Sequence, residues 1–336
     1  MSLLSFQRFL ITKLSIQDQS NKNIVFLFGP TAVGKTGLLC SFFSSSFEAV
    51  NADSVQVYKR LNIGSAKASE DERRKIKHHL IDILEPWESY SVADFIRLGD
   101  KALNEIIKKG KYPVFSGGTA YYFKHYLYGL SNAPRSDEKT REEVKLFMEE
   151  AGKEKGYGFL KSVDPVSASR INKNDTYRVS RAIEVYKSCG RPLSSFALPT
   201  EPRDGIKALI IGLYREKEEL TKRIRLRVDQ MFKEGLLDEI SSLLSEGANP
   251  SWQSMQAIGY KEFLNFLFED RKLREDGVKT LTQAELSEIK EQICMNSIHY
   301  AKRQMTFFRS FKDVHWVHAE DEKTLSSLIK SGPFST

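Results

Sequence analysis

The stretch GPTAVGKT, from Gly29 to Thr36, directly follows the apolar run Ile24–Phe28. It fits the pattern G-x-x-x-x-G-K-[ST] between a buried strand and a helix, which is the setting of a phosphate-binding loop, or P-loop. Glycines let successive backbone N–H groups point inward, and the helix N-terminus adds partial positive charge. Lys35 can neutralise phosphate oxygens, and the Thr36 hydroxyl can ligate Mg²⁺. We therefore predict that a polyphosphorylated ligand binds here; the alternative is a glycine turn that only packs.

The pattern of strands and helices around this loop predicts an α/β fold. Apolar runs predict strands at 23–28, 47–52, 78–84, 112–119 and 207–214, with a candidate late strand at 316–318. Helical patterns separate them, such as the apolar stripe between Ala93 and Lys109, which Gly110 ends. Strands that alternate with helices indicate a P-loop NTPase-like parallel sheet flanked by helices.

The character of the sequence changes between residues 131 and 202, where charged helical patterns replace apolar strands. We interpret this stretch as a helical insertion between two halves of the sheet-bearing core, 23–130 and 203–320. The pattern from 216 to 311 is helical apart from a loop at 247–254, and 321–336 is expected to be a C-terminal tail. Residues 1–22 are interpreted as an N-terminal extension rather than a signal peptide, with a transit peptide as the alternative.

Composition limits the classes of protein to which the chain can belong. It has 336 residues, with 51 Lys and Arg against 44 Asp and Glu, for a net charge of +7. This excess favours a polyanionic partner, although a basic enzyme without one has the same balance. Three widely spaced cysteines without a CxxC pair predict neither a disulfide framework nor a zinc site, and a cytoplasmic location fits. No apolar run reaches the roughly 18 residues of a membrane-spanning helix.

Polar residues at two other predicted strand ends complete the candidate site. Asp53 follows the second strand, and the carboxyl ends of parallel strands face the ligand crevice, so Asp53 should lie near the P-loop. Its alternative roles are a magnesium ligand or a helix N-cap. The SGGT stretch, residues 116–119, brings Thr119 and backbone N–H groups to the same rim. The P-loop motif alone leaves open whether a phosphate is transferred or released.

A series of motifs makes the interpretation specific. In order, they are GPTAVGKT, NADSVQVY, GSAK, HHLID, YSVADF, SGGTAYYFK, INKND, RVSRAIEV, AIGYKE and YAKRQMTFFR. The series resembles the bacterial-type tRNA dimethylallyltransferases, or tRNA isopentenyltransferases, from residue 24 to residue 317. The resemblance implies transfer of the dimethylallyl group of dimethylallyl diphosphate to N6 of the adenosine 3′ of the anticodon. It further implies a tRNA anticodon stem-loop as partner, release of diphosphate and Mg²⁺ as cofactor. We expect a monomer.

The resemblance also assigns roles to residues. Asp53 matches the base, Arg223 the diphosphate clamp with Arg227 as the alternative, and Thr119 a residue beside the transferred group. The implied diphosphate contacts are Gly29, Thr31, Ala32, Val33, Gly34, Lys35 and Thr36. The implied tRNA contacts are Asp53, Ser54, Val55, Gln56, Thr119, Arg141, Tyr177, Arg178, Val179, Ser180, Arg181, Gln256, Ala257, Ile258, Gly259, Tyr260 and Lys261. Tyr177 and Tyr260 are expected to stack on RNA bases, with half-buried surface tyrosines as the alternative.

The chemistry of the reaction agrees with these residue types. An exocyclic adenine amine is a poor nucleophile, so a carboxylate that accepts its proton assists attack. Positive charges around the departing diphosphate stabilise the charge that develops there. Three rival functions remain: prenylation of a free adenine nucleotide, a small-molecule kinase on the same fold, and an RNA-binding protein without catalysis. The helical insertion and the net positive charge favour tRNA as the substrate.

Overall fold

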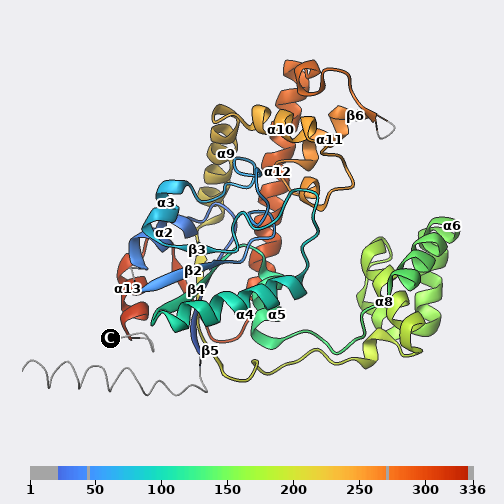
Figure 1. Cartoon of the computed structure of the whole chain (residues 1–336), viewed down its shortest axis with the longest axis horizontal. Helices are drawn as coiled ribbons and strands as arrows, with labels where there is room; N and C mark the ends of the chain where they lie inside the picture. The colour runs from blue at the N-terminus through green and yellow to red at the C-terminus, as the bar shows by residue number, and fades with distance from the viewer. Residues whose placement is uncertain (1–21, 44–45, 270–271, 332–336) are drawn as a thin grey trace, which may run out of the picture. The chain divides into compact units, whose positions relative to one another are not determined.

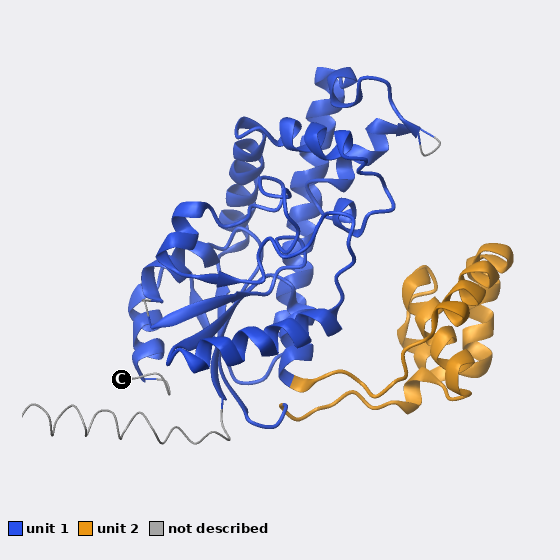
Figure 2. Cartoon of the chain, viewed as in Figure 1, with its two compact units in different colours: residues 1–127, 203–336 blue, residues 128–202 orange. Residues whose placement is uncertain are grey.

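The computed structural model describes residues 22–43, 46–269 and 272–331, and the chain divides into two compact units (Figure 2). Unit 1 comprises residues 1–127 and 203–336, and unit 2 comprises residues 128–202. The helical insertion therefore begins at 128 rather than at the expected 131. Residues 1–21, which contain almost all of the predicted N-terminal extension, lie outside the described residues.

Unit 1 is built on a six-stranded sheet with the order β3-β2-β4-β1-β5-β8. Every pair of neighbours is parallel, which confirms the predicted sheet. The strands are β1 (Lys22–Phe28), β2 (Phe47–Asn51), β3 (His78–His79), β4 (Tyr112–Gly117), β5 (Ile206–Tyr214) and β8 (Val314–His318). Because β1 is central and covered on both faces, its sequence is a continuous apolar run rather than an alternating one.

Helices flank this sheet and extend beyond it (Figure 1). In unit 1 they are α2 (Lys35–Phe42), α3 (Glu70–Lys75), α4 (Val92–Lys108), α5 (Ala120–Tyr128), α9 (Lys217–Lys233), α10 (Leu236–Ser245), α11 (Lys261–Leu267), α12 (Gln283–Phe308) and α13 (Glu322–Ser331). Capping boxes explain where two of the long helices begin, Ser91 with Asp94 for α4 and Thr282 with Glu285 for α12. None of the helices in the described ranges is long and apolar enough to cross a membrane.

The two faces of β1 pack against different partners. Phe28 stacks on Phe308 of α12 with ring centroids 4.1 Å apart, and Phe26 meets Phe123 of α5 edge to face at 5.1 Å. Val25 and Leu27 point to the opposite core cluster, which also contains buried residues of α2 and α13. The P-loop therefore leaves a strand that is fixed from both sides, with α12 packed beside it.

Three expectations about secondary structure are wrong in detail. Only His78 and His79 of the run 78–84 pair as a strand, because Leu80 and Asp82 adopt positive φ angles that break the extended chain. A hairpin of β6 (Phe268–Glu269) and β7 (Lys272–Leu273) interrupts the region expected to be helical up to 311. The predicted C-terminal tail instead contains α13, whose Leu325 and Ile329 belong to the core.

Unit 2 has its own small apolar core. Its helices are α6 (Glu138–Val163), α7 (Pro165–Arg170) and α8 (Thr176–Cys189), followed by the 3₁₀ helix η1 (Leu193–Ser195). Gly152 interrupts α6 with a φ of 72°, so the chain bends back on itself within this element. Buried residues of α6, α7 and α8 form the core: Val144, Leu160, Ala168, Val179, Ala182 and Ile183.

Candidate active site

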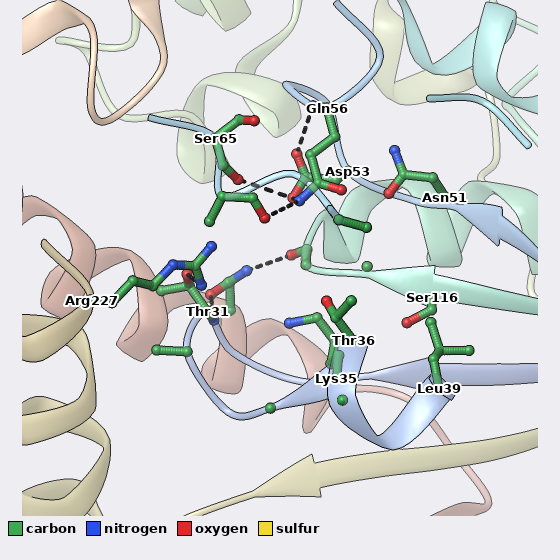
Figure 3. A pocket seen from close by; sticks show the side chains of 18 of the residues that line it. Thr31, Lys35, Thr36, Leu39, Asn51, Asp53, Gln56, Ser65, Ser116 and Arg227 are labelled. Atoms are coloured by element: carbon green, nitrogen blue, oxygen red, sulfur yellow. Dashed lines mark hydrogen bonds between the residues drawn. The ribbon is translucent and has the colours of Figure 1, made fainter. Parts of the chain in front are cut away.

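The P-loop lies where the sequence motif predicts, between the end of β1 and the start of α2. Gly34 is the N-cap of α2 with a φ of 110°, a conformation that side chains other than glycine rarely adopt. The Lys35 ammonium donates hydrogen bonds of 2.9 Å each to the carbonyl oxygens of Gly29 and Pro30. Lys35 and Thr36 face Asp53, Gln56 and Ser65 across a cavity (Figure 3).

Asp53 lies beside the P-loop because β2 and β1 both pair with β4, so their carboxyl ends meet at one edge of the sheet. Its Oδ1 atom accepts backbone N–H groups from Val55, at 2.9 Å, and Gln56, at 3.3 Å. Residues 54–60 form bends, turns and an isolated bridge rather than a helix, so Asp53 does not cap a helix. No hydrogen bond from the described residues reaches Oδ2, which leaves this oxygen available to a substrate.

Gln304 of α12 connects two of these strand ends. Its Oε1 accepts the Thr31 N–H at 2.8 Å, and its Nε2 donates to the Gly118 carbonyl at 2.7 Å. A Cβ atom on Gly118 would lie 2.4 Å from Nε2, so a larger residue there would displace the Gln304 amide. Gln304 is a site residue that sequence reasoning missed. The signal for it is the helical spacing of Tyr300, Gln304 and the core residue Phe308 on one side of α12.

Three arginines surround the P-loop. Arg223 and Arg227 lie on the same face of α9, and both line the cavity. Arg223 donates from Nε to the Ala32 carbonyl at 2.9 Å, and Arg227 donates to the Thr31 hydroxyl at 3.4 Å. Arg215, which sequence reasoning missed, donates from Nε to the Val33 carbonyl at 2.9 Å. Burial lowers the pKa of the Arg227 guanidinium, Asp53 opposes this shift, and Arg223 adds to it.

Two cavities meet beside Asp53. The P-loop cavity has a volume of 480 Å³ and contains Lys35 and Thr36 in its wall. The interhelical cavity has a volume of 320 Å³ and lies against apolar and polar side chains of α9 and α12. The residues common to both walls are Thr31, Asp53, Ser65, Arg227 and Tyr300. A group that leaves a ligand in one cavity can therefore reach a ligand in the other while both contact Asp53.

The charge of Lys35 is sensitive to what occupies the P-loop cavity. Its pKa is lowered from 10.5 to about 7, chiefly by burial and also by the charge of Arg227, while Asp53 partly opposes the shift. A bound diphosphate would favour the ammonium form, because opposite charges stabilise each other at short range. Binding should therefore raise the pKa of Lys35 and draw a proton from solution.

We expect binding of dimethylallyl diphosphate, the donor that the resemblance implies, to take up close to one proton per molecule bound at pH 8.5 in the absence of tRNA. Lys35 in the free protein is mostly neutral there, since its pKa is about 7, and becomes charged in the complex. Below pH 7 the uptake should fade, because Lys35 is then already protonated. Calorimetry in two buffers of different ionisation enthalpy measures the uptake. An undiminished uptake in Lys35→Met would assign the proton to another group.

Of the other predicted site residues, some line the two cavities and some do not. Thr119 does not line either of the two cavities; its hydroxyl accepts the Ser54 N–H at 3.1 Å and so supports the turn after Asp53. Contact of Thr119 with a substrate therefore stays a prediction. The 256–261 segment supplies Gln256, Ala257, Ile258 and Lys261 to the interhelical cavity.

The expectation that Tyr260 stacks on RNA is wrong. Its side chain is fully buried, and its hydroxyl accepts the Ser65 N–H and donates to Glu239. Val179 is likewise buried, in the core of unit 2, so its side chain cannot meet RNA. Each of these two residues belongs to a motif that contains both exposed and buried residues. The motif spacing alone does not show which of them are buried.

Other predicted RNA contacts in unit 2 are exposed. Tyr177 is 80% exposed, and the Arg178 side chain is 69% exposed and forms an ion pair with Asp175. Arg181 instead donates to the Pro134 carbonyl and the Ser136 hydroxyl, which ties the start of unit 2 to α8. Arg141 lies on α6 in unit 2, and its implied contact with tRNA stays a prediction.

The donors at the P-loop suit Mg²⁺ bound together with a phosphate ligand. Thr36 and Asp53 bring a hydroxyl and a carboxylate oxygen to one cavity. Within the described ranges no cluster of three or more His, Cys, Asp or Glu side chains could hold a metal on its own. Mg²⁺ commonly takes one or two protein oxygens and completes its shell with phosphate oxygens and water, and these residues fit that mode.

Comparison with known proteins decides the family. Residues 56–311 match the family model described as IPP transferase. The chain belongs to this family. This agrees with the motif series and the parallel sheet, and it confirms the resemblance seen in the sequence.

Members of the IPP transferase family resemble this chain over most of its length. It is 42% identical over 299 residues to a tRNA dimethylallyltransferase of Borreliella burgdorferi, covering 89% of this chain and 94% of the relative. It is similar in structure to the full-length tRNA isopentenylpyrophosphate transferase of Bacillus halodurans, with a TM-score of 0.62, 36% identity, and 92% and 94% of the chains covered. A eukaryotic dimethylallyltransferase crystallised while acting on tRNA has a TM-score of 0.69 at 25% identity, covering 93% of this chain and 77% of that one.

Proposed function

We propose that this protein transfers the dimethylallyl group of dimethylallyl diphosphate to N6 of the adenosine 3′-adjacent to the anticodon in tRNA, releasing diphosphate. The observation that carries the proposal is the meeting of two cavities at Asp53. Transfer of a group between two ligands requires that both ligands bind beside the same general base. Hydrolysis of a single ligand has no such requirement. The similarity to a eukaryotic dimethylallyltransferase acting on tRNA supports the choice of acceptor.

The P-loop cavity suits the donor diphosphate. Lys35, Arg223 and Arg227 surround it with positive charge, and the helix N-terminus at Gly34 adds more. Such preorganised charges act most strongly where negative charge develops, on the departing diphosphate. Bound Mg²⁺, held by Thr36 and the phosphates, would neutralise further charge on that leaving group.

The interhelical cavity suits the target adenine. An adenine stacked in an anticodon loop must be extruded before an enzyme can reach its N6 atom, at a cost of a few kcal/mol. Apolar side chains of α9 and α12, such as Val228 and Ile293, offer a surface for the flipped base. Asp53 lines the same cavity and can accept the N6 proton through its Oδ2 atom as the new C–N bond forms.

Every residue that lines the two cavities belongs to unit 1 of a single chain. We therefore propose that a monomer carries the complete catalytic site. Light scattering of the active enzyme at assay concentration would measure its mass, and loss of activity on dilution below a dimerisation threshold would contradict this proposal.

Mass spectrometry of nucleosides tests the reaction directly. Unmodified tRNA is incubated with the protein, dimethylallyl diphosphate and Mg²⁺, then digested; adenosine bearing one added C₅H₈ unit is expected. Parallel incubation with AMP tests the free-nucleotide rival, and ATP in place of the donor tests the kinase rival. Modification of AMP but not of tRNA, or formation of ADP, would exclude the proposed function.

The exposed arginine of unit 2 should contribute to tRNA binding through charge. Arg178→Ala should flatten the dependence of log affinity on log salt by about one unit, since it removes one phosphate contact. Arg181→Ala should mainly lower the stability of unit 2, because its partners are Pro134 and Ser136. Filter binding across a salt series measures the slopes. An unchanged slope in Arg178→Ala would place the anticodon stem elsewhere.

A further inference from the structure

One loop forms part of the wall of both cavities. It comprises residues 61–66 and is called the 61–66 loop below. Ser65 lines both cavities, Gly64 lines the interhelical cavity, and Ala66 lines the P-loop cavity. The position of this loop therefore affects the volume offered to each substrate at once.

A carboxylate outside both cavities holds the 61–66 loop. Glu239, in the first turn of α10, accepts the N–H groups of Asn62 and Ile63 at Oε2, each at 2.8 Å. Its Oε1 accepts the Gly64 N–H at 3.1 Å and the Tyr260 hydroxyl at 2.7 Å. Three successive backbone N–H groups thus surround one negative charge, the arrangement of an anion-binding nest. Here the anion is a side chain of the protein itself.

Tyr260 extends this arrangement and locks the loop against its neighbour. Its hydroxyl accepts the Ser65 N–H at 3.1 Å while it donates to Glu239, so four consecutive N–H groups are satisfied. A Cβ on Gly64 would lie 2.6 Å from the Tyr260 ring, and one on Gly259 would lie 2.8 Å from the Gly64 carbonyl. The 61–66 loop and the segment before α11 therefore fit together with no room for adjustment.

The 61–66 loop is also bonded to Gln56, whose backbone in turn is bonded to Asp53. The Gln56 side chain donates to the carbonyl oxygens of Ser65, at 3.3 Å, and Ala66, at 3.2 Å. The Gln56 backbone N–H donates to Oδ1 of Asp53. A continuous series of hydrogen bonds thus runs from α10 through the 61–66 loop and Gln56 to the Asp53 carboxylate.

We infer that Glu239 and Tyr260 are positioning residues for the transfer reaction: they hold the 61–66 loop and, through Gln56, orient Asp53 toward the acceptor. The inference rests on the function proposed above. Neither residue lines the two cavities in which the reacting groups are proposed to bind. Their effect is on the geometry of proton removal, which is sensitive to misplacement of about 1 Å.

The charge of Glu239 is essential to this arrangement. A carboxylate accepts hydrogen bonds at both oxygens, whereas an amide presents two N–H donors at one end. In Glu239→Gln, the amide NH₂ would face either the N–H groups of Asn62 and Ile63 or the Gly64 N–H and the Tyr260 hydroxyl. Two N–H donors would then oppose each other at one end of the side chain, and the loop must move to separate them.

Single-turnover kinetics with saturating donor and an anticodon stem-loop RNA tests the inference. The rate constant should fall by about 10- to 100-fold in Glu239→Gln and in Tyr260→Phe. The amplitude, which counts active molecules, and donor affinity, measured by calorimetry, should stay near the wild-type values. A misfolded variant would instead lose amplitude, so the two readouts separate positioning from folding. Tyr260→Phe removes one hydroxyl only and serves as the second variant if Glu239→Gln fails to fold.

The chain offers a matched control at the same pair of elements. Glu246, just after α10, forms an ion pair with Arg60, just before the 61–66 loop, and no hydrogen bond or ion pair among the described residues joins its side chain to that loop. Glu246→Gln should therefore retain the wild-type rate constant. Equal losses in Glu246→Gln and Glu239→Gln, or a wild-type rate in both Glu239→Gln and Tyr260→Phe, would overturn the inference. Absence of product with the wild-type protein would instead overturn the proposed function.

Discussion

Asp53→Asn is expected to lower turnover by about 10²–10⁴, the usual range for general base catalysis. Asparagine keeps the shape of the side chain, and its carbonyl oxygen can still accept the Val55 and Gln56 N–H groups at the Oδ1 position. The Oδ2 position, however, becomes an amide nitrogen that cannot accept a proton. Binding of donor and tRNA should change little, because the P-loop, its arginines and unit 2 are untouched. Single-turnover rates and equilibrium binding, measured on the same preparation, give both quantities.

A titration of Mg²⁺ separates the two roles open to Asp53. If Asp53 is the base, extra Mg²⁺ should not restore the rate of Asp53→Asn. If Asp53 mainly holds Mg²⁺, donor affinity should fall and high Mg²⁺ should recover much of the rate. Recovery of that kind would contradict the assignment of Asp53 as the base, and a water or Thr119 would then need to take the proton.

Arg223→Ala is expected to lower turnover by about 10²–10³ at saturating donor, the loss typical of a preorganised charge at a developing anion. Arg223 lines the P-loop cavity and donates to the Ala32 carbonyl. Its removal therefore lowers the positive charge of the cavity and removes a hydrogen bond that holds the P-loop. The affinity for tRNA should survive. Steady-state rates over a range of donor concentrations separate kcat from KM and so locate the effect in the transition state.

Two neighbours on α9 provide the comparison for Arg223. Lys222→Ala removes an exposed charge from the same turn and should retain the wild-type rate. Arg227→Ala should weaken the binding of both donor and acceptor, because Arg227 lines both cavities. Of the two cavities, Arg223 lines only the P-loop cavity. A near-normal kcat in Arg223→Ala together with a large loss in Arg227→Ala would move the clamp to Arg227.

Local signals in the sequence determined much of this protein. The run Ile24–Phe28 followed by GPTAVGKT predicts both a central strand and a phosphate loop. The prediction is possible because the glycines and the lysine that bind phosphate lie within eight consecutive residues. Asp53 could be placed at the same edge of the sheet, because strand polarity in a parallel sheet puts successive carboxyl ends together. The motif series between residues 24 and 317 indicated the family and the reaction, which the physical patterns alone did not.

Only the tertiary structure decided which side chains around that edge hold the site. Gln304 connects Thr31 to Gly118 from a helix more than 180 residues away in the chain, and no local pattern predicts such a contact. Tyr260 resembled a surface tyrosine in the sequence, yet it is buried because Glu239 and the 61–66 loop surround its hydroxyl. Helical periodicity indicates that a face is covered, but it does not identify the partner. Long-range packing supplies that partner, and here it determines how Asp53 is held.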